Sequence, residues 1–169
     1  MKPSPLQLHH YHFTSLAITV AQGFDLSKMA SGESPYPQID PEDLKVEIRA
    51  GEPESDGSEL FVVSVAVAYE PPANSGFPYE FSASVEGVFT LEATDDGQDR
   101  EKIVVVNGAG MLMGAIREQL LTLSARHRFG PILLPTLDLR QLAPEERTKQ
   151  TVATKPKRKA AKPAKKPKP

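Results

Sequence analysis

A glycine-rich segment that follows a run of valines is the part of this sequence that most resembles a motif with a chemical function. Ile103–Val106 leads into Gly108 and Gly110, with Gly114 four residues further on. A buried strand, a glycine turn and a helix N-terminus together bind the diphosphate of a dinucleotide, and Asp138 stands where an acid would bind the ribose. A dinucleotide-binding oxidoreductase that uses the Gly108/Gly110 turn is therefore one interpretation.

Three features count against a dinucleotide site. The glycine spacing is G-x-G-x-x-x-G, and Pro131 and Pro135 flank and interrupt the segment that would form the second strand. The fold also needs several further crossovers, but only a short Pro- and Lys-rich segment follows. Gly108 and Gly110 are better interpreted as allowing a tight turn and cap before a helix.

Other combinations of chemically active residues are weaker. His10 and His12 would share one face of a strand, but no third metal ligand is suggested near them, so solvated edge-strand histidines are the favoured interpretation. No G-x-S-x-G motif occurs, and Ser124 and His127 have ordinary helical spacing. The paired acids fall in loops or in a terminal turn. We therefore predict a protein that is not an enzyme and has no metal or cofactor.

The amino-acid composition further restricts the kinds of site and partner that this protein can have. The chain has 169 residues and no cysteine, which excludes disulfides, thiolate metal sites and a thiol nucleophile. The segment 149–169 holds nine of the twenty Lys and Arg residues and no acid, so residues 1–148 carry eleven basic against 22 acidic residues. An acidic body repels nucleic acid and anionic membranes. The tail, including Lys155–Lys168, is expected to be disordered and to attract anionic partners weakly.

The hydrophobic pattern predicts strands joined by irregular loops, followed by one helix. Strands are expected at residues 6–21, 44–48, 59–70 and 78–93, with a one-residue bulge in the first and a second bulge beyond Gly87 in the fourth. Short connections favour an antiparallel sheet. The amphipathic helix runs over Gly110–Arg126, is closed by Gly130 and Pro131, and leads into a Leu/Pro-rich extended return.

The segment from Asn107 to Leu142 resembles the C-terminal half of the SecB family of protein-export chaperones. The resemblance rests on an Asn, a helix with an early Arg, a Phe-Pro exit, a Leu/Pro segment and an Asp-plus-apolar motif. Glu86–Leu91 is similar to the Gly-apolar-Phe fourth strand of that family. The matching positions in the C-terminal half are Asn107, Leu112, Arg117, Arg126, Phe129, Pro131, Leu133, Leu134, Pro135, Leu137, Asp138 and Leu142.

This resemblance implies an α+β fold with a SecB-like four-stranded antiparallel sheet backed by one long helix, over residues 1–148. It implies an ATP-independent holdase that binds unfolded preproteins in apolar grooves for export or targeting, and that assembles as a dimer of dimers in the cytoplasm. No signal peptide or membrane span is recognised in the sequence. The residues expected to bind clients or to form subunit interfaces are Met111, Leu112, Ile116, Leu120, Leu123, Leu133, Leu134, Leu137, Leu139 and Leu142.

The sequence departs from the SecB pattern in three places. Met113-Gly114 replaces a Pro-aromatic pair early in the helix, and Pro144 predicts a second helix that is short or absent. Ser15, Thr19 and Ser82 align with the acids through which the family docks the SecA motor, which puts SecA as a partner in doubt. A solitary SecB-like chaperone, such as those that serve toxin–antitoxin systems, is one alternative. A non-enzymatic adaptor that works through its basic tail is another.

Overall fold

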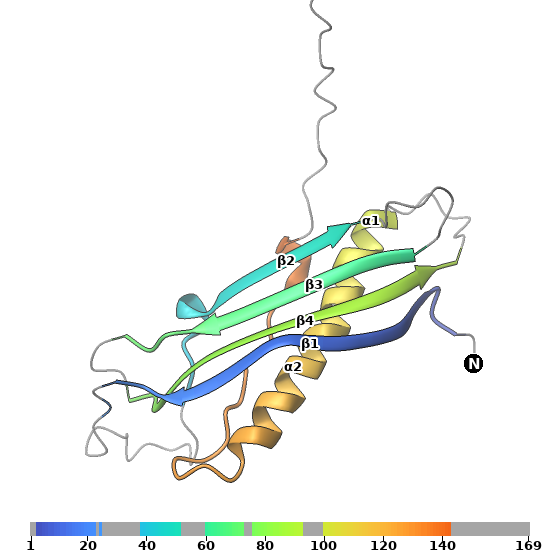
Figure 1. The fold of residues 1–169 in the computed structure, drawn as a ribbon. Coiled ribbons are helices and arrows are strands. Elements are labelled where there is room, and N and C mark those ends of the chain that lie inside the picture. The colour runs from blue at the N-terminus through green and yellow to red at the C-terminus, as the bar shows by residue number, and fades with distance from the viewer. Residues whose placement is uncertain are drawn as a thin grey trace, which may run out of the picture.

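The fold is one antiparallel sheet with a helical segment and an extended segment on one of its faces (Figure 1). A computed structural model describes residues 3–22, 24, 38–51, 60–72, 76–92 and 100–142. Its strands are β1 (Leu6–Val20), β2 (Lys45–Gly51), β3 (Leu60–Tyr69) and β4 (Tyr79–Leu91). They lie in the order β1-β4-β3-β2, so β1 and β2 are the two edges. The predicted α+β class and the four-stranded antiparallel sheet are confirmed.

The two central strands divide the sheet into an inner face toward the helix and an outer face. Residues with odd numbers in β3 and β4 point inward and are buried from Val63 and Tyr79 onward, whereas those with even numbers point outward. Strict alternation in β4 means that the bulge predicted beyond Gly87 is wrong. Gly87 itself occupies an inward position, where a Cβ atom would lie 2.9 Å from Cδ2 of Leu112. Glycine is needed there because the helix comes too close for any side chain.

β1 contains two bulges where the sequence predicted one. Its register with β4 shifts between Leu8 and His10 and again between Phe13 and Ser15. Each extra residue reverses which side chains point inward, so the second shift restores the orientation that the first one changed. The inward side chains, identified from the facing residues of β4, are Leu6, Leu8, Tyr11, Phe13, Leu16, Ile18 and Val20.

The helical segment is longer than predicted and begins earlier. It consists of α1 (Arg100–Ile103), a π-helical turn (Val104–Gly108) and α2 (Ala109–Ser124), which follow one another without a break. The predicted turn at Gly108 and Gly110 is therefore wrong. A Cβ atom on Gly108 would lie 3.2 Å from Val63, so this glycine lets the helix approach the sheet. The extra residue of the π turn keeps Val104 and Val105 buried on the same side as Gly108 and Ala109.

The helix ends at Ser124, before the expected stop at Gly130. Gly130 has a φ of 86° and forms the turn into the extended segment Pro131–Asp138, which we call the strap. Two 3₁₀ turns complete the described elements, at Pro41–Asp43 and Leu139–Leu142. Asp40 caps the first of these by accepting a hydrogen bond from the Glu42 amide at 3.0 Å. The predicted short or absent second helix after Leu142 and the basic tail at 149–169 lie outside the described residues.

Candidate functional site

The inner face of β1 carries apolar side chains that the other described elements leave partly open. The helix packs against β3 and β4, and it leaves β1 at the margin of its contact. Phe13, Leu16 and Ile18 are consequently only half-buried, while Tyr11 is 46% exposed and Val20 is 52% exposed. We call these five side chains the β1 strip. They adjoin a strand edge that no described strand pairs with, so an apolar surface and unpaired backbone groups occur together.

The predicted site residues on α2 fall into two groups, one buried and one exposed. Leu112, Ile116 and Leu120 have no exposed surface and lie in the core against the sheet, so they cannot contact a client while the chain is folded as described. Met111 and Leu123 are 40% and 43% exposed on the other sides of the helix. The predicted apolar stripe was thus wider than the stripe that the sheet covers. Gly114 also lies on the open side, with no atom within 4 Å of a built Cβ.

The remaining predicted residues lie in the strap, which runs beside α2, and in the 3₁₀ turn Leu139–Leu142 that follows it. Leu134 is buried, Leu137 and Leu139 are half-buried, and Leu133 points outward with 40% of its surface exposed. Leu142 ends the described part of the chain, and its side chain is outside the described atoms. The structure therefore leaves Met111, Leu123 and Leu133 as the predicted residues with extensive accessible apolar surface.

Polar side chains fix the strap to α2. Arg117 donates from Nη2 to the Pro135 carbonyl at 3.0 Å and from Nε to the Leu134 carbonyl at 3.4 Å. The buried Ser124 hydroxyl donates to the Leu120 carbonyl at 2.5 Å and accepts the Ile132 amide at 2.7 Å. These bonds satisfy backbone groups that an extended segment outside the sheet would otherwise leave unpaired. The exposed Leu133 is therefore held on a fixed support.

Tyr79 forms the other anchor, and its hydroxyl donates to the Gly130 carbonyl at 2.6 Å. Burial raises the pKa of Tyr79 above its ordinary value of 10.0. Because the folded state holds this proton more tightly than the unfolded state, the contribution of the protonated hydroxyl to folding stability is complete below pH 10 and is lost as the pH rises through the folded-state pKa.

We expect Tyr79→Phe to lower the free energy of unfolding by about 1 kcal/mol at neutral pH. Urea titrations between pH 8 and 11 should show a smaller alkaline loss in the variant than in the parent chain.

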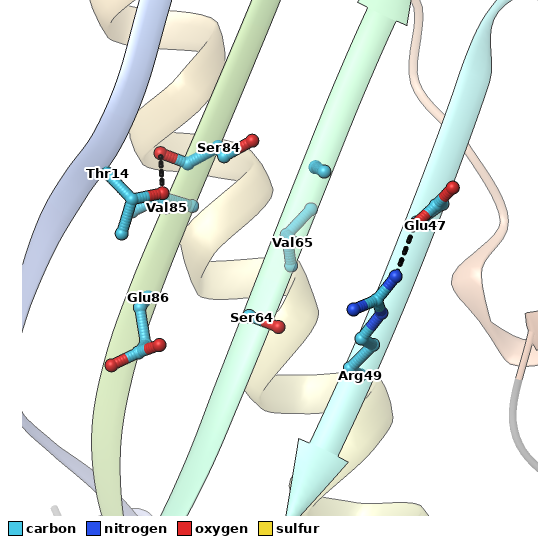
Figure 2. A pocket seen from close by; sticks show the side chains of 9 residues that line it. Thr14, Glu47, Arg49, Ser64, Val65, Ser84, Val85 and Glu86 are labelled. Carbon is cyan, nitrogen blue, oxygen red and sulfur yellow. Dashed lines mark hydrogen bonds and ion pairs between the residues drawn. The ribbon is translucent and has the colours of Figure 1, made fainter.

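The outer face of the sheet is polar and shallow. A hollow of 280 Å³ is lined by small side chains such as Ser64 and Ser84, with Glu86 on one side and Arg49 on the other (Figure 2). Arg49 is paired with Glu47 at 3.1 Å, an exposed ion pair that contributes about 0–1 kcal/mol. Ser15 lies opposite Ser84, Thr19 opposite Glu80, and Ser82 opposite Ala17. The three positions expected to align with docking acids thus share this face as hydroxyls.

The described residues also test the alternative interpretations as a metal site and as a dinucleotide site. In that part of the chain, no group of three His, Asp or Glu side chains is placed to hold a metal ion. Asp138, the proposed ribose acid, accepts hydrogen bonds from Nε and Nη2 of Arg140, both at 2.9 Å, and the bonding to Arg140 lowers the pKa of Asp138. Neither segment that the dinucleotide interpretation needs as a strand is one, because 103–106 is helical and 132–138 is the strap. No described helix has the length and apolar character that crossing a bilayer requires.

Comparison with known proteins gives likenesses in structure only. The sequence matches no protein-family model, and no curated protein matches it. A SecB-like chaperone of Mycobacterium tuberculosis, solved in complex with an antitoxin peptide, is similar over 79% of this chain and 91% of its own, with 14% identity and a TM-score of 0.49. A Streptococcus agalactiae protein of unknown function is similar over 78% of this chain and 97% of its own, with 7% identity and a TM-score of 0.45.

Proposed function

We propose that this protein is an ATP-independent molecular chaperone of the holdase type, which binds unfolded polypeptides through apolar side chains on its surface and catalyses no reaction. The observation that carries the proposal is the set of large apolar side chains that stay exposed outside the buried core of the described residues. Five of them are between 40% and 52% exposed: Tyr11, Val20, Met111, Leu123 and Leu133. A surface of this kind serves association with other chains.

The accessible residues suit clients of varied sequence. Met111 has a flexible thioether side chain that adapts to differently shaped partners, and Leu123 and Leu133 bind by area rather than by directed hydrogen bonds. The sequence resemblance to the SecB family supports the same function, since it rests on the helix and strap that present these residues. Clients would be unfolded preproteins, held for export or for another targeting route in the cytoplasm.

Self-association is part of the proposal. The β1 strip and the open β1 edge offer one contact, and the exposed side of α2 around Gly114 offers a second. Two different self-contacts are what a dimer of dimers requires. Hydroxyls at Ser15, Thr19 and Ser82 stand where the SecB family has the acids that dock SecA. We therefore favour a solitary chaperone over one that delivers its clients to SecA.

The direct test is the aggregation of a chemically unfolded model client without nucleotide. Stoichiometric amounts of the protein should delay aggregation, and no delay at several-fold excess would overturn the proposal.

Removing residues 149–169 distinguishes a holdase from the adaptor alternative. A holdase keeps its client binding, whereas an adaptor that works through the basic tail loses its partner.

The exposed leucines give a sharper test. We expect Leu123→Asp combined with Leu133→Asp to weaken client binding about tenfold, because each substitution removes apolar area and adds a charge that the client must desolvate. Peptide-binding affinity and delay of aggregation measure the effect. The matched control is Thr122→Asp combined with Thr136→Asp, which places the same charges at exposed positions on the same helix and strap. Equal losses in both double variants would show that added charge, and not the leucine surface, is responsible.

A further inference from the structure

The strap is an extended segment that is held in place by side chains. It lies outside the four-stranded sheet, and no backbone–backbone hydrogen bond joins residues 131–138 to another described element. Instead, Arg117 donates to two of its carbonyls, and the Ser124 hydroxyl accepts the Ile132 amide. A strand in a backbone ladder leaves only when the sheet opens. A segment held by side chains is able to leave while the sheet and the helix stay intact.

The strap fills an apolar space on the inner face of the sheet, beside α2 (Figure 1). Its side chains alternate as those of a strand do, because Ile132 and Leu134 are buried and Leu133 between them is exposed. The two buried residues belong to the same core cluster as Leu112 and Ile116 of α2. We call the space that Ile132 and Leu134 fill the strap channel. The strap thus occupies this channel as an extended apolar polypeptide would.

We propose that the strap is a built-in competitor of clients, which leaves the strap channel and is replaced there by an extended apolar segment of an unfolded polypeptide. The inference rests on the holdase function proposed above and adds the means by which the binding surface is enlarged. The strap itself defines the occupant, since its two buried residues are separated by one exposed residue. Segments with alternating apolar residues are therefore the favoured clients of the channel. Their apparent affinity is the intrinsic affinity reduced by the fraction of molecules in which the strap is open.

Arg117 is the positioning residue that sets how often the channel opens. Its Nη2 and Nε atoms lie 3.0 Å and 3.4 Å from the strap carbonyls that they bind. Arg117→Met keeps an apolar stem and removes both bonds, so the open fraction rises. We expect this variant to bind a fluorescent peptide of the strap sequence, PILLPTLDL, about tenfold more tightly than the parent chain does. The matched control is Arg126→Met, at an exposed arginine that makes no hydrogen bond to the strap, and it should bind the peptide like the parent chain.

A disulfide should hold the strap closed, and the chain has no cysteine of its own to interfere. The Ser124 hydroxyl oxygen is 2.7 Å from the Ile132 amide nitrogen, so the two Cα atoms lie within about 7 Å, which a disulfide spans. In a chain with Ser124→Cys and Ile132→Cys, the oxidised form should bind the PILLPTLDL peptide about tenfold more weakly than the same chain after reduction. Ser124→Cys alone is the control, and its affinity should be the same under both conditions.

The peptide titrations and the aggregation assay separate this inference from the proposed function. If the parent chain delays aggregation of an unfolded client but the oxidised and reduced forms bind the peptide equally, the strap is not a competitor and the holdase function stands. Unchanged or weaker peptide binding by Arg117→Met would also overturn the inference, because loss of a merely structural contact frees no channel. If the parent chain does not delay aggregation while oxidation still weakens peptide binding, the holdase function fails and the strap channel stands as a peptide site.

Discussion

A Tyr11→Glu variant is expected to be a folded monomer at concentrations where the parent chain forms dimers. Tyr11 is 46% exposed and lies edge-on to Phe13, with 6.3 Å between ring centroids, so it is a prominent accessible group of the β1 strip. Glutamate there would bring a charge into the apolar contact proposed for the β1 strip, and no inward residue of β1 is a cation that could pair with it. We expect association to weaken about 100-fold, which corresponds to about 2.8 kcal/mol.

Sedimentation equilibrium of the parent chain and the variant measures this change, and circular dichroism confirms that the fold is retained. The control is Ser82→Glu, which adds the same charge to an exposed outer-face position on β4, on the opposite face of the sheet from the β1 strip. We expect it to associate like the parent chain. If Tyr11→Glu also dimerises unchanged, then β1 is not the self-association surface.

The strands were predictable because their alternation is local and strong. Apolar residues at 44, 46 and 48 alternate with charged ones, and Leu60–Tyr69 is apolar on nearly both faces, as a central strand should be. The bulges were harder to place. The apolar residues of β1 change sides twice, but a bulge is defined by the register with a partner strand, and the sequence of one strand does not contain that register.

The helix shows a second limit of prediction from sequence. Gly108 and Gly110 resemble a turn locally, yet Gly108 is needed because the helix comes within contact distance of Val63 and Phe89, which are far away in the sequence. The apolar stripe on α2 likewise did not show that Leu112 and Ile116 are buried while Met111 and Leu123 are open. Only the position of the helix over β3 and β4 decides that. Spacing along a helix defines its faces, and the tertiary contact selects which face is covered.

The apolar residues of the helix and strap, to which the sequence pointed as the candidate site, stay a prediction. The sequence did not point to the β1 strip. The apolar residues of the strip, such as Phe13, Leu16 and Ile18, are visible in the sequence. They indicate an accessible surface only once β1 is known to be an edge strand, because a central strand has a neighbouring strand along each of its two edges.

Gly87→Val is expected to lower the free energy of unfolding by about 3 kcal/mol. A Cβ atom at this position would lie 2.9 Å from Cδ2 of Leu112 and 3.0 Å from Cε2 of Phe89, and neither side chain has any exposed surface. The two further methyl groups of valine need more room, so α2 must move away from β4. That movement would also loosen Gly108, which packs against Phe89.

The matched control for this substitution is Gly51→Val at the end of β2, where no described atom lies within 4 Å of a built Cβ. Valine favours strands more than glycine does, so this variant should be as stable as the parent chain or slightly more stable. Urea unfolding at one fixed protein concentration measures all three chains, with similar m-values showing that the same surface is exposed. A midpoint for Gly87→Val that equals the Gly51→Val midpoint would mean that the helix and sheet are not in close contact at Gly87. The helix would then lie farther from the sheet than described. Leu112 and Ile116 would in that case be more accessible, and the accessible apolar surface would not be limited to β1, Leu123 and Leu133.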